Sequence, residues 1–114
     1  MTLFGISAAT LLAWLLALAF LGAGVVNAAG SSKVKDDFVR WGYPRWWNYV
    51  TGGLEVLVAA LIATPAARVA GLSLGAAICV AAIVTVVRHK DYGHLAPGAI
   101  LAVLLAFDLA LFLG

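Results

Sequence analysis

The chain has 114 residues, of which 65% are hydrophobic and only 11% are charged, and its formal net charge at pH 7 is +2. A soluble domain is about half apolar and about a quarter charged, and a chain of this length could not hide so much apolar surface from water. The composition therefore excludes an ordinary soluble protein and predicts one integral membrane domain over residues 1–114.

Four continuous apolar runs are each close to the roughly 20 residues that a helix needs to cross a bilayer. None of them shows the period-two alternation of barrel strands, so we expect an all-α fold, a bundle of four transmembrane helices. The first run lacks the charged start of a signal peptide and exceeds the roughly 7–15 residues of a signal core, so we expect a retained helix. The four predicted spans cover residues 3–26, 47–64, 69–87 and 95–113.

A short amphipathic helix is predicted at residues 33–41, between the first two spans. Val34, Phe38 and Trp41 recur at helical spacing on one side of it, and Ser31 is a suitable N-cap. We expect this helix to lie in the membrane interface, where the aromatic residues that follow it anchor the second span.

Two interpretations are open for the polar and aromatic side chains at the end of this helix. They can simply set the depth and orientation of the second span. Alternatively, they can form a lid or a lipid-headgroup site. The residues concerned are Arg40, Tyr43, Arg45 and Trp46.

Basic residues gather in the two loops that follow the first and third spans. Residues 27–46 and 88–94 hold six of the seven Lys and Arg side chains, and the opposite side holds only Arg68. The positive-inside rule then predicts that both loops face the cytoplasm and both termini face outward, in the cell membrane. The basic charge thus has a topological explanation, and no nucleic-acid partner is expected.

Small residues recur at every fourth position in three of the spans. Such stripes let helix backbones approach closely in lipid, so we expect a tight bundle or a dimer. The stripes are Gly5, Ala9, Ala13 and Ala17; Gly71, Gly75 and Cys79; and Gly98, Ala102, Ala106, Ala110 and Gly114.

Polar side chains inside the spans are the candidate functional residues, because a polar group in lipid is costly and usually has a role. We predict a polar pocket that opens to the cytoplasm and is lined by Glu55, Thr85 and His89, with Asn27 beside them. The structural alternative is that Glu55 only fastens helices by pairing with a basic side chain, namely Arg45, Arg88 or His89.

Asp108 and Trp14 lie deeper in their spans. We expect Asp108 to point to a cavity or a second protomer and so to belong to a ligand or proton site. The alternative is that its carboxylate snorkels to the outer surface. The indole N–H of Trp14 needs an acceptor, which a carboxylate would supply.

No catalytic, redox or metal-binding motif is visible. The one cysteine, Cys79, cannot form an intramolecular disulfide and is expected to be a packing residue. The two histidines stand five residues apart in a loop without other ligands nearby, so no metal or haem is expected and no cofactor is encoded.

The segment "GYPRWWNYVTGGLEVLVAALIATPAAR", followed by "VTVVRH", resembles the DoxX-like family of small membrane proteins. In that pattern Gly-Tyr-Pro follows the first helix, a glycine precedes a glutamate in the second, proline and arginine precede the third, and a histidine ends it. The lysine often found near the end of the first helix is displaced here to Lys33. The matching residues are Gly42, Tyr43, Pro44, Gly52, Glu55, Pro65, Arg68 and His89.

The resemblance implies a four-helix bundle in the plasma membrane but no single activity. The family takes its name from a subunit of a thiosulfate:quinone oxidoreductase, other members are associated with oxidative-stress complexes, and distant animal relatives act in receptor assembly or cargo export. Because this chain supplies no redox centre, thiosulfate oxidation is not carried over to it.

Three functions are therefore compared. The first is a non-enzymatic module whose pocket at Glu55 and His89 holds a lipid, a quinone or a partner membrane protein. The second is an accessory subunit of a quinone-linked oxidoreductase, in which Glu55 accepts a proton from a quinol. The third, a small proton-coupled exporter, is disfavoured because such exporters carry their glutamate in the first helix, which has no acid here.

Overall fold

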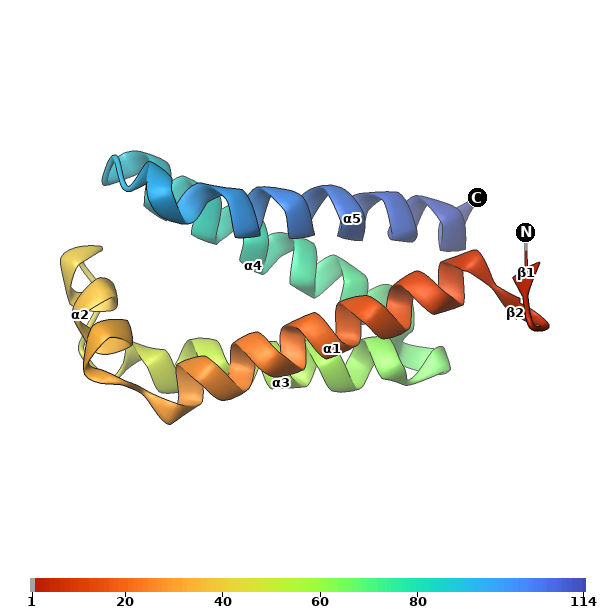
Figure 1. Cartoon of the computed structure of the whole chain (residues 1–114), viewed down its shortest axis with the longest axis horizontal. Coiled ribbons are helices and arrows are strands. Elements are labelled where there is room, and N and C mark those ends of the chain that lie inside the picture. Colours follow the sequence, from red (N-terminus) through yellow and green to blue (C-terminus); the bar gives the residue numbers. More distant parts are fainter. Residues whose placement is uncertain (1) are drawn as a thin grey trace.

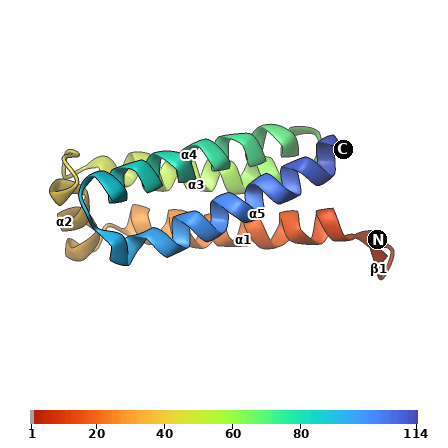
Figure 2. The ribbon, with the colours of Figure 1, turned by 90° about the horizontal axis from the view of Figure 1, so that it is seen from above.

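The computed structural model describes residues 2–114 and is all-α apart from a very small hairpin. Four helices run alongside one another, and a short fifth helix, α2, lies across one end (Figure 1). Both chain ends lie at the opposite end of the bundle, as Figure 2 also shows from above. The helices are α1 (Ala8–Ala29), α2 (Ser32–Arg40), α3 (Trp47–Ala63), α4 (Arg68–Arg88) and α5 (Leu95–Leu113), with 3-10 turns η1 (Pro65–Ala67) and η2 (Tyr92–His94).

The helices are arranged as two antiparallel pairs. α1 packs chiefly on α3, α4 packs chiefly on α5, and contacts between α3 and α4 join the pairs. The core contains Leu16 and Phe20 of α1, Ile62 of α3, Leu72 of α4 and Leu105 of α5. Cys79 joins this cluster with 4% of its surface exposed, so the prediction of a packing cysteine is confirmed.

Three segments are long and apolar enough to cross a membrane: Ala8–Ala29, Pro65–Arg88 and Tyr92–Leu113. The predicted second span forms α3, which is apolar but has only 17 residues. Large apolar side chains such as Leu18 and Val103 are 65% and 68% exposed on the outside of the bundle, as expected for helices in contact with lipid. The chain is an all-α, multi-pass membrane protein.

The first helix begins five residues later than predicted. Thr2–Leu3 (β1) pairs antiparallel with Ile6–Ser7 (β2). The turn between them has positive φ at Phe4 (53°) and at Gly5 (78°), as a two-residue hairpin turn requires. The Ser7 side chain then accepts a hydrogen bond from the Thr10 N–H (3.0 Å) and caps α1. Hydropathy alone could not reveal this cap, so the predicted helical start was wrong.

The remaining boundaries agree with the prediction more closely. α1 continues three residues past residue 26, to Ala29, and Gly30 ends it in the left-handed conformation (φ 65°). The predicted N-cap of α2 is confirmed, because Ser31 Oγ accepts a hydrogen bond from the Val34 N–H at 3.3 Å. Phe38 is the buried residue of α2 and meets the rings of Trp41 and Tyr43 edge-on.

The closest approach of helices α1 and α3 is not made by the residues of the three predicted stripes. A Cβ atom added to Gly52 would lie 2.7 Å from the Ala28 nitrogen and 2.8 Å from the Gly24 carbonyl oxygen. Of the predicted first stripe, Gly5 lies in the hairpin turn outside α1. The backbone contact that a small-residue interface requires is therefore made by Gly24, Ala28 and Gly52.

The other two stripes differ in outcome. On α4 the prediction is confirmed: a Cβ at Gly71 would lie 2.7 Å from the Ile62 nitrogen, and Gly75 faces core side chains. On α5 only the first part of the stripe faces the bundle. Ala102 packs against the core, and a Cβ at Gly98 would lie 3.5 Å from Ile83 Cγ1, whereas Ala106 and Ala110 are exposed. In the second half of that helix the buried residues are Leu105 and Asp108.

Candidate functional site

Glu55 lies between α1 and α3 and is 9% exposed. Asn27, in the last turns of α1, donates a hydrogen bond from Nδ2 to Glu55 Oε1 at 2.5 Å. Within residues 2–114 no other side chain donates to this carboxylate. The sequence correctly joined these two residues, but the basic partners considered for Glu55 lie elsewhere: Arg45 pairs with Asp36 (2.6 Å).

Asn48 extends this polar contact to the end of the bundle. Its side chain is fully buried, its Nδ2 donates to the Asn27 carbonyl oxygen (2.8 Å), and its Oδ1 accepts from Lys35 Nζ (3.1 Å). Lys35 of α2 is thereby linked through Asn48 and Asn27 to Glu55. The sequence interpretation missed Asn48, although a polar residue in the first turn of an apolar span is a usable signal.

A groove lies on the surface of α4, beside the end of the bundle where α2 is found. Its volume is about 540 Å³. The Tyr43 hydroxyl lies 2.8 Å from Thr85 Oγ1, and His89 Nδ1 lies 2.9 Å from the Thr85 carbonyl oxygen. The lining residues are Trp41, Gly42, Tyr43, Ala81, Val84, Thr85, Arg88 and His89.

The predicted single pocket is thus divided between two places. Thr85 and His89 line the groove on α4, whereas Glu55 and Asn27 meet between α1 and α3 and do not line it. The sequence shows that Thr85 and His89 share one side of a helix, but it does not show which neighbouring segment covers that side.

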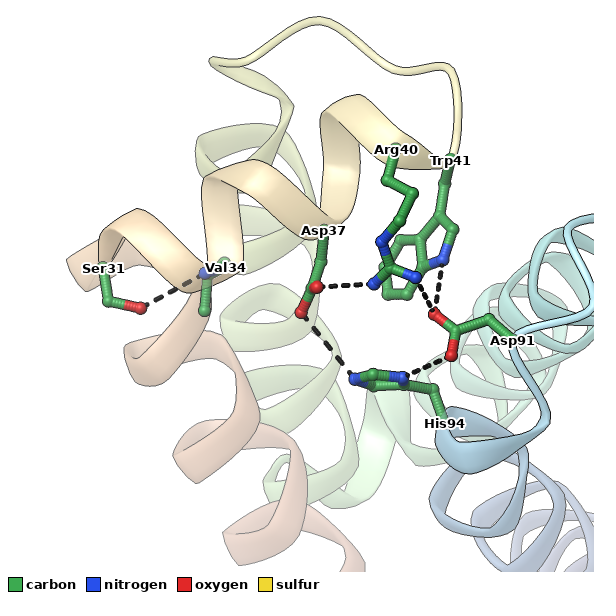
Figure 3. Close-up of polar contacts among 7 residues, drawn as sticks. All are labelled: Ser31, Val34, Asp37, Arg40, Trp41, Asp91 and His94. Atoms are coloured by element: carbon green, nitrogen blue, oxygen red, sulfur yellow. Dashed lines mark hydrogen bonds and ion pairs between the residues drawn. The ribbon is translucent and has the colours of Figure 1, made fainter.

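Five polar side chains form a cluster, the clasp, that ties α2 to the segment before α5 (Figure 3). Asp91 Oδ2 accepts hydrogen bonds from Arg40 Nη1 (2.6 Å) and from Trp41 Nε1 (3.0 Å), and Asp91 Oδ1 lies 3.0 Å from His94 Nδ1. Asp37 pairs with Arg40 at 2.6 Å and lies 3.7 Å from His94 Nε2. Four residues of the clasp were not predicted as site residues, because the clasp joins two segments that are distant in the sequence. These residues are Asp37, Trp41, Asp91 and His94.

The contacts of the clasp shift the pKa values of Asp91 and Arg40. The hydrogen bond with His94, followed by those from Arg40 and Trp41, lowers the pKa of Asp91 from 3.8 to about 2. The hydrogen bonds that Arg40 donates to Asp37 and Asp91 raise the pKa of its guanidinium group. Both shifts favour the charged forms, so the clasp is an ionic contact at neutral pH.

The lowered pKa of Asp91 predicts how stability depends on pH. Because folding lowers this pKa, the stabilisation is present above about pH 4 and is lost as the pH falls toward about 2. Asp91→Asn is expected to lower the melting temperature in detergent at neutral pH and to flatten the pH profile below about pH 4. Asp36→Asn, in an exposed ion pair with 65% of the Asp36 side chain accessible, is the control that leaves the profile unchanged. Equal profiles for wild type and Asp91→Asn would contradict this role.

The four predicted lid or headgroup residues do not form one site. Arg40 belongs to the clasp and Tyr43 to the groove, while Arg45 pairs with Asp36. Trp46 is 57% exposed beside Trp47.

Trp14 is 44% exposed and lines an apolar groove of about 480 Å³ between α1 and α3. In the described part of the chain its indole makes no hydrogen bond to Glu55 or to Asp108. The expectation that a carboxylate accepts from this indole was therefore wrong, because Trp14 faces outward from the bundle.

Asp108 is completely buried, and in residues 2–114 neither of its carboxyl oxygens has a hydrogen-bond partner. The snorkelling alternative is therefore wrong. Arg68, itself only 7% exposed, lies near Asp108 and donates from Nε to the Ile62 carbonyl oxygen at 2.7 Å. Its guanidinium carbon lies 5.5 Å from the centre of the Phe112 ring.

In the described residues, no group of three or more His, Cys, Asp or Glu side chains could hold a metal ion. The polar features are instead a buried Asn–Glu contact, an aromatic groove, an ionic clasp and a buried Asp near an Arg. These features and the fold define a small multi-pass helical membrane protein with polar sites at both ends of its bundle.

Comparison with known families identifies this class more closely. The DoxX-like family matches residues 11–107, which is most of the chain. The chain belongs to the DoxX-like family, and the resemblance found in the sequence is confirmed. Comparisons with curated proteins and with solved structures gave no significant match.

Proposed function

We propose that this protein is a non-enzymatic membrane module that holds the polar head of an amphipathic ligand, a lipid or a quinone, in the groove on α4. The observation that carries the proposal is the groove itself, which combines polar side chains with an apolar wall. Its rim carries hydroxyl, guanidinium and imidazole groups, which belong to Tyr43, Thr85, Arg88 and His89.

The proposal places the groove at the cytoplasmic side of a bilayer crossed four times, in the cell membrane. α3 lies alongside α1, and its 17 residues extend about 26 Å, close to the roughly 30 Å hydrocarbon thickness. The end of the bundle that carries α2 also carries the two basic loops (Figure 1), which the positive-inside rule assigns to the cytoplasm.

The chemistry of the groove fits a head group at the membrane interface. Arg88 is exposed and offers several donors to a phosphate or a carbonyl oxygen. The Tyr43 hydroxyl is held by Thr85 in a fixed orientation. Val84 and Ala81 lie about one and two turns of α4 before Arg88, so an acyl or isoprenoid tail can follow the helix into the bilayer.

The test is native mass spectrometry of the full chain, with lipid extraction. Val84→Trp fills the groove at a position that is 49% exposed, so folding is preserved. We expect one defined lipid or quinone with the wild type and at least a tenfold loss of it from Val84→Trp. Leu18→Trp, at an exposed position of α1 in the apolar groove beside Trp14, is the matched control that keeps the ligand. Only bulk phospholipid in all three proteins would contradict the proposal.

The second candidate is an accessory subunit of a quinone-linked oxidoreductase. It is favoured by the burial of Glu55, to which in the described residues only the Asn27 amide donates, because a carboxyl group in such a place can take a proton from a quinol. Quinone-dependent activity of a membrane complex that is abolished by Glu55→Gln, with the ligand still bound in the groove, would favour this function over the first.

A further inference from the structure

The buried pair of Asp108 and Arg68 lies at the other end of the bundle from the groove and the clasp. Arg68 begins α4 directly after η1, and Asp108 lies near the end of α5. The end of α5 lies at the opposite end of the bundle from α2 (Figure 1). The groove on α4 involves neither residue. The pair therefore requires an explanation of its own.

The state of Asp108 is unusual for a carboxyl group inside a protein. Both oxygens are buried and, in residues 2–114, unpartnered. A carboxylate in this position would be unpaired in a medium of low dielectric constant, which is energetically unfavourable. A protonated carboxyl group avoids most of that cost. The geometry therefore corresponds to the acid that has taken up a proton.

Arg68 binds one acceptor in the structure and lies near a second potential acceptor, the Asp108 carboxyl group. In the structure its Nε donates to the Ile62 carbonyl oxygen, in the last turn of α3. That carbonyl is among the last four of α3, which lack partners within the helix. Phe112, one turn after Asp108 on α5, lies against the guanidinium group. Loss of the proton from Asp108 would create a carboxylate near the same guanidinium group.

We propose that Asp108 is a proton-binding site and that Arg68 is its switchable counter-charge. With the proton bound, Asp108 is neutral and Arg68 holds the Ile62 carbonyl. When the carboxyl O–H bond breaks and the proton leaves, the guanidinium group pairs with the carboxylate and releases the end of α3. The conformation of the turn between α3 and α4 then depends on whether Asp108 carries a proton.

The surroundings support an isolated titrating site. α1 contains no titratable side chain, and Asp108 is the only one in α5. In α3 the titratable groups are Tyr49 in the first turn and Glu55 at the middle of the helix. In α4, Cys79 and Arg88 stand three and nearly six turns after Arg68. Among the described residues, Arg68 is thus the charged side chain near Asp108.

The experiment is infrared spectroscopy of the full chain in lipid nanodiscs, titrated from about pH 4 to about pH 8. A protonated carboxyl group in a dry site gives a C=O band that shifts in D₂O. We compare Glu55→Gln, which removes the other buried acid, with Glu55→Gln/Asp108→Asn. We expect such a band in the first protein and its loss in the second, and the same background is used for the Arg68 variants. Absence of the band from Glu55→Gln, or its persistence in Glu55→Gln/Asp108→Asn, would overturn the proposal.

The role of Arg68 is tested with two variants. A positive charge nearby favours the ionised acid, so Arg68→Gln is expected to move the midpoint of the band upward by about one pH unit or more. Arg68→Lys keeps the charge and is expected to leave the midpoint near that of Glu55→Gln alone. If Arg68→Gln does not fold, the switch is tested by the midpoint in Arg68→Lys and by a second measurement. The Ile62 carbonyl group is labelled with an isotope, and its infrared band is followed as the pH changes. An Ile62 band that does not change with pH would overturn the switch.

Discussion

Gly52→Ala is expected to lower the free energy of unfolding by about 1–3 kcal/mol, the usual cost of overpacking a close contact. The added Cβ would stand 2.7 Å from the Ala28 nitrogen and 2.8 Å from the Gly24 carbonyl oxygen. Both are backbone atoms, so the side chains cannot relieve the clash and α1 must move away from α3. The measurement is reversible unfolding in mixed detergent micelles.

Gly53→Ala is the matched control for this change. It is adjacent in sequence and in the same helix, but a Cβ there meets nothing within 4 Å. Alanine is the better helix former, so this variant is expected to be neutral or more stable by roughly 0.5–1 kcal/mol. Equal stability of the two alanine variants would show that Gly52 is not a point of contact between helices.

Asn27→Leu is expected to cost about 2 kcal/mol or more, because it leaves a buried Glu55 carboxyl group without its hydrogen-bond donor. Glu55→Leu in the same background removes the group that was left unpaired. The double variant is therefore expected to regain much of the lost stability, giving a coupling energy of about 1 kcal/mol or more in a double-mutant cycle. Unfolding in detergent micelles measures all four proteins of the cycle.

This cycle also separates two roles for Glu55. If the double variant is stable and keeps its ligand and partners, Glu55 only fastens α1 to α3. If it is stable but has lost a quinone-dependent activity, Glu55 belongs to a functional site. Additive costs of the two single changes would contradict the contact between Asn27 and Glu55.

Hydropathy and charge were sufficient to predict most of the fold. The uninterrupted apolar runs defined α3, α4 and α5 to within about one residue at each end, because lipid requires every backbone group to be bonded inside a helix. They failed at residues 3–7, where the turn at Phe4 and Gly5 and the cap by Ser7 depend on local hydrogen bonds and not on apolar character.

The candidate sites were predictable only in part, because a helical wheel gives the direction of a side chain but not its neighbour. Asn27 was correctly placed with Glu55. The separation of Glu55 from His89, and the pairing of Arg40 with Asp91 across 51 positions, depend on how the two helix pairs pack. No pattern within a single segment contains that information.

The two helix pairs are joined in different ways at their two ends. At one end the chain itself connects α3 to α4 through Thr64 and the three residues of η1, which keeps these helix ends close together. At the other end the ion pairs and hydrogen bonds of the clasp hold α2 to the segment before α5. Arg40 is about half exposed there, and added salt weakens exposed ion pairs. The bundle therefore has one end that is closed by the chain itself and another end whose ionic contacts weaken as the salt concentration rises.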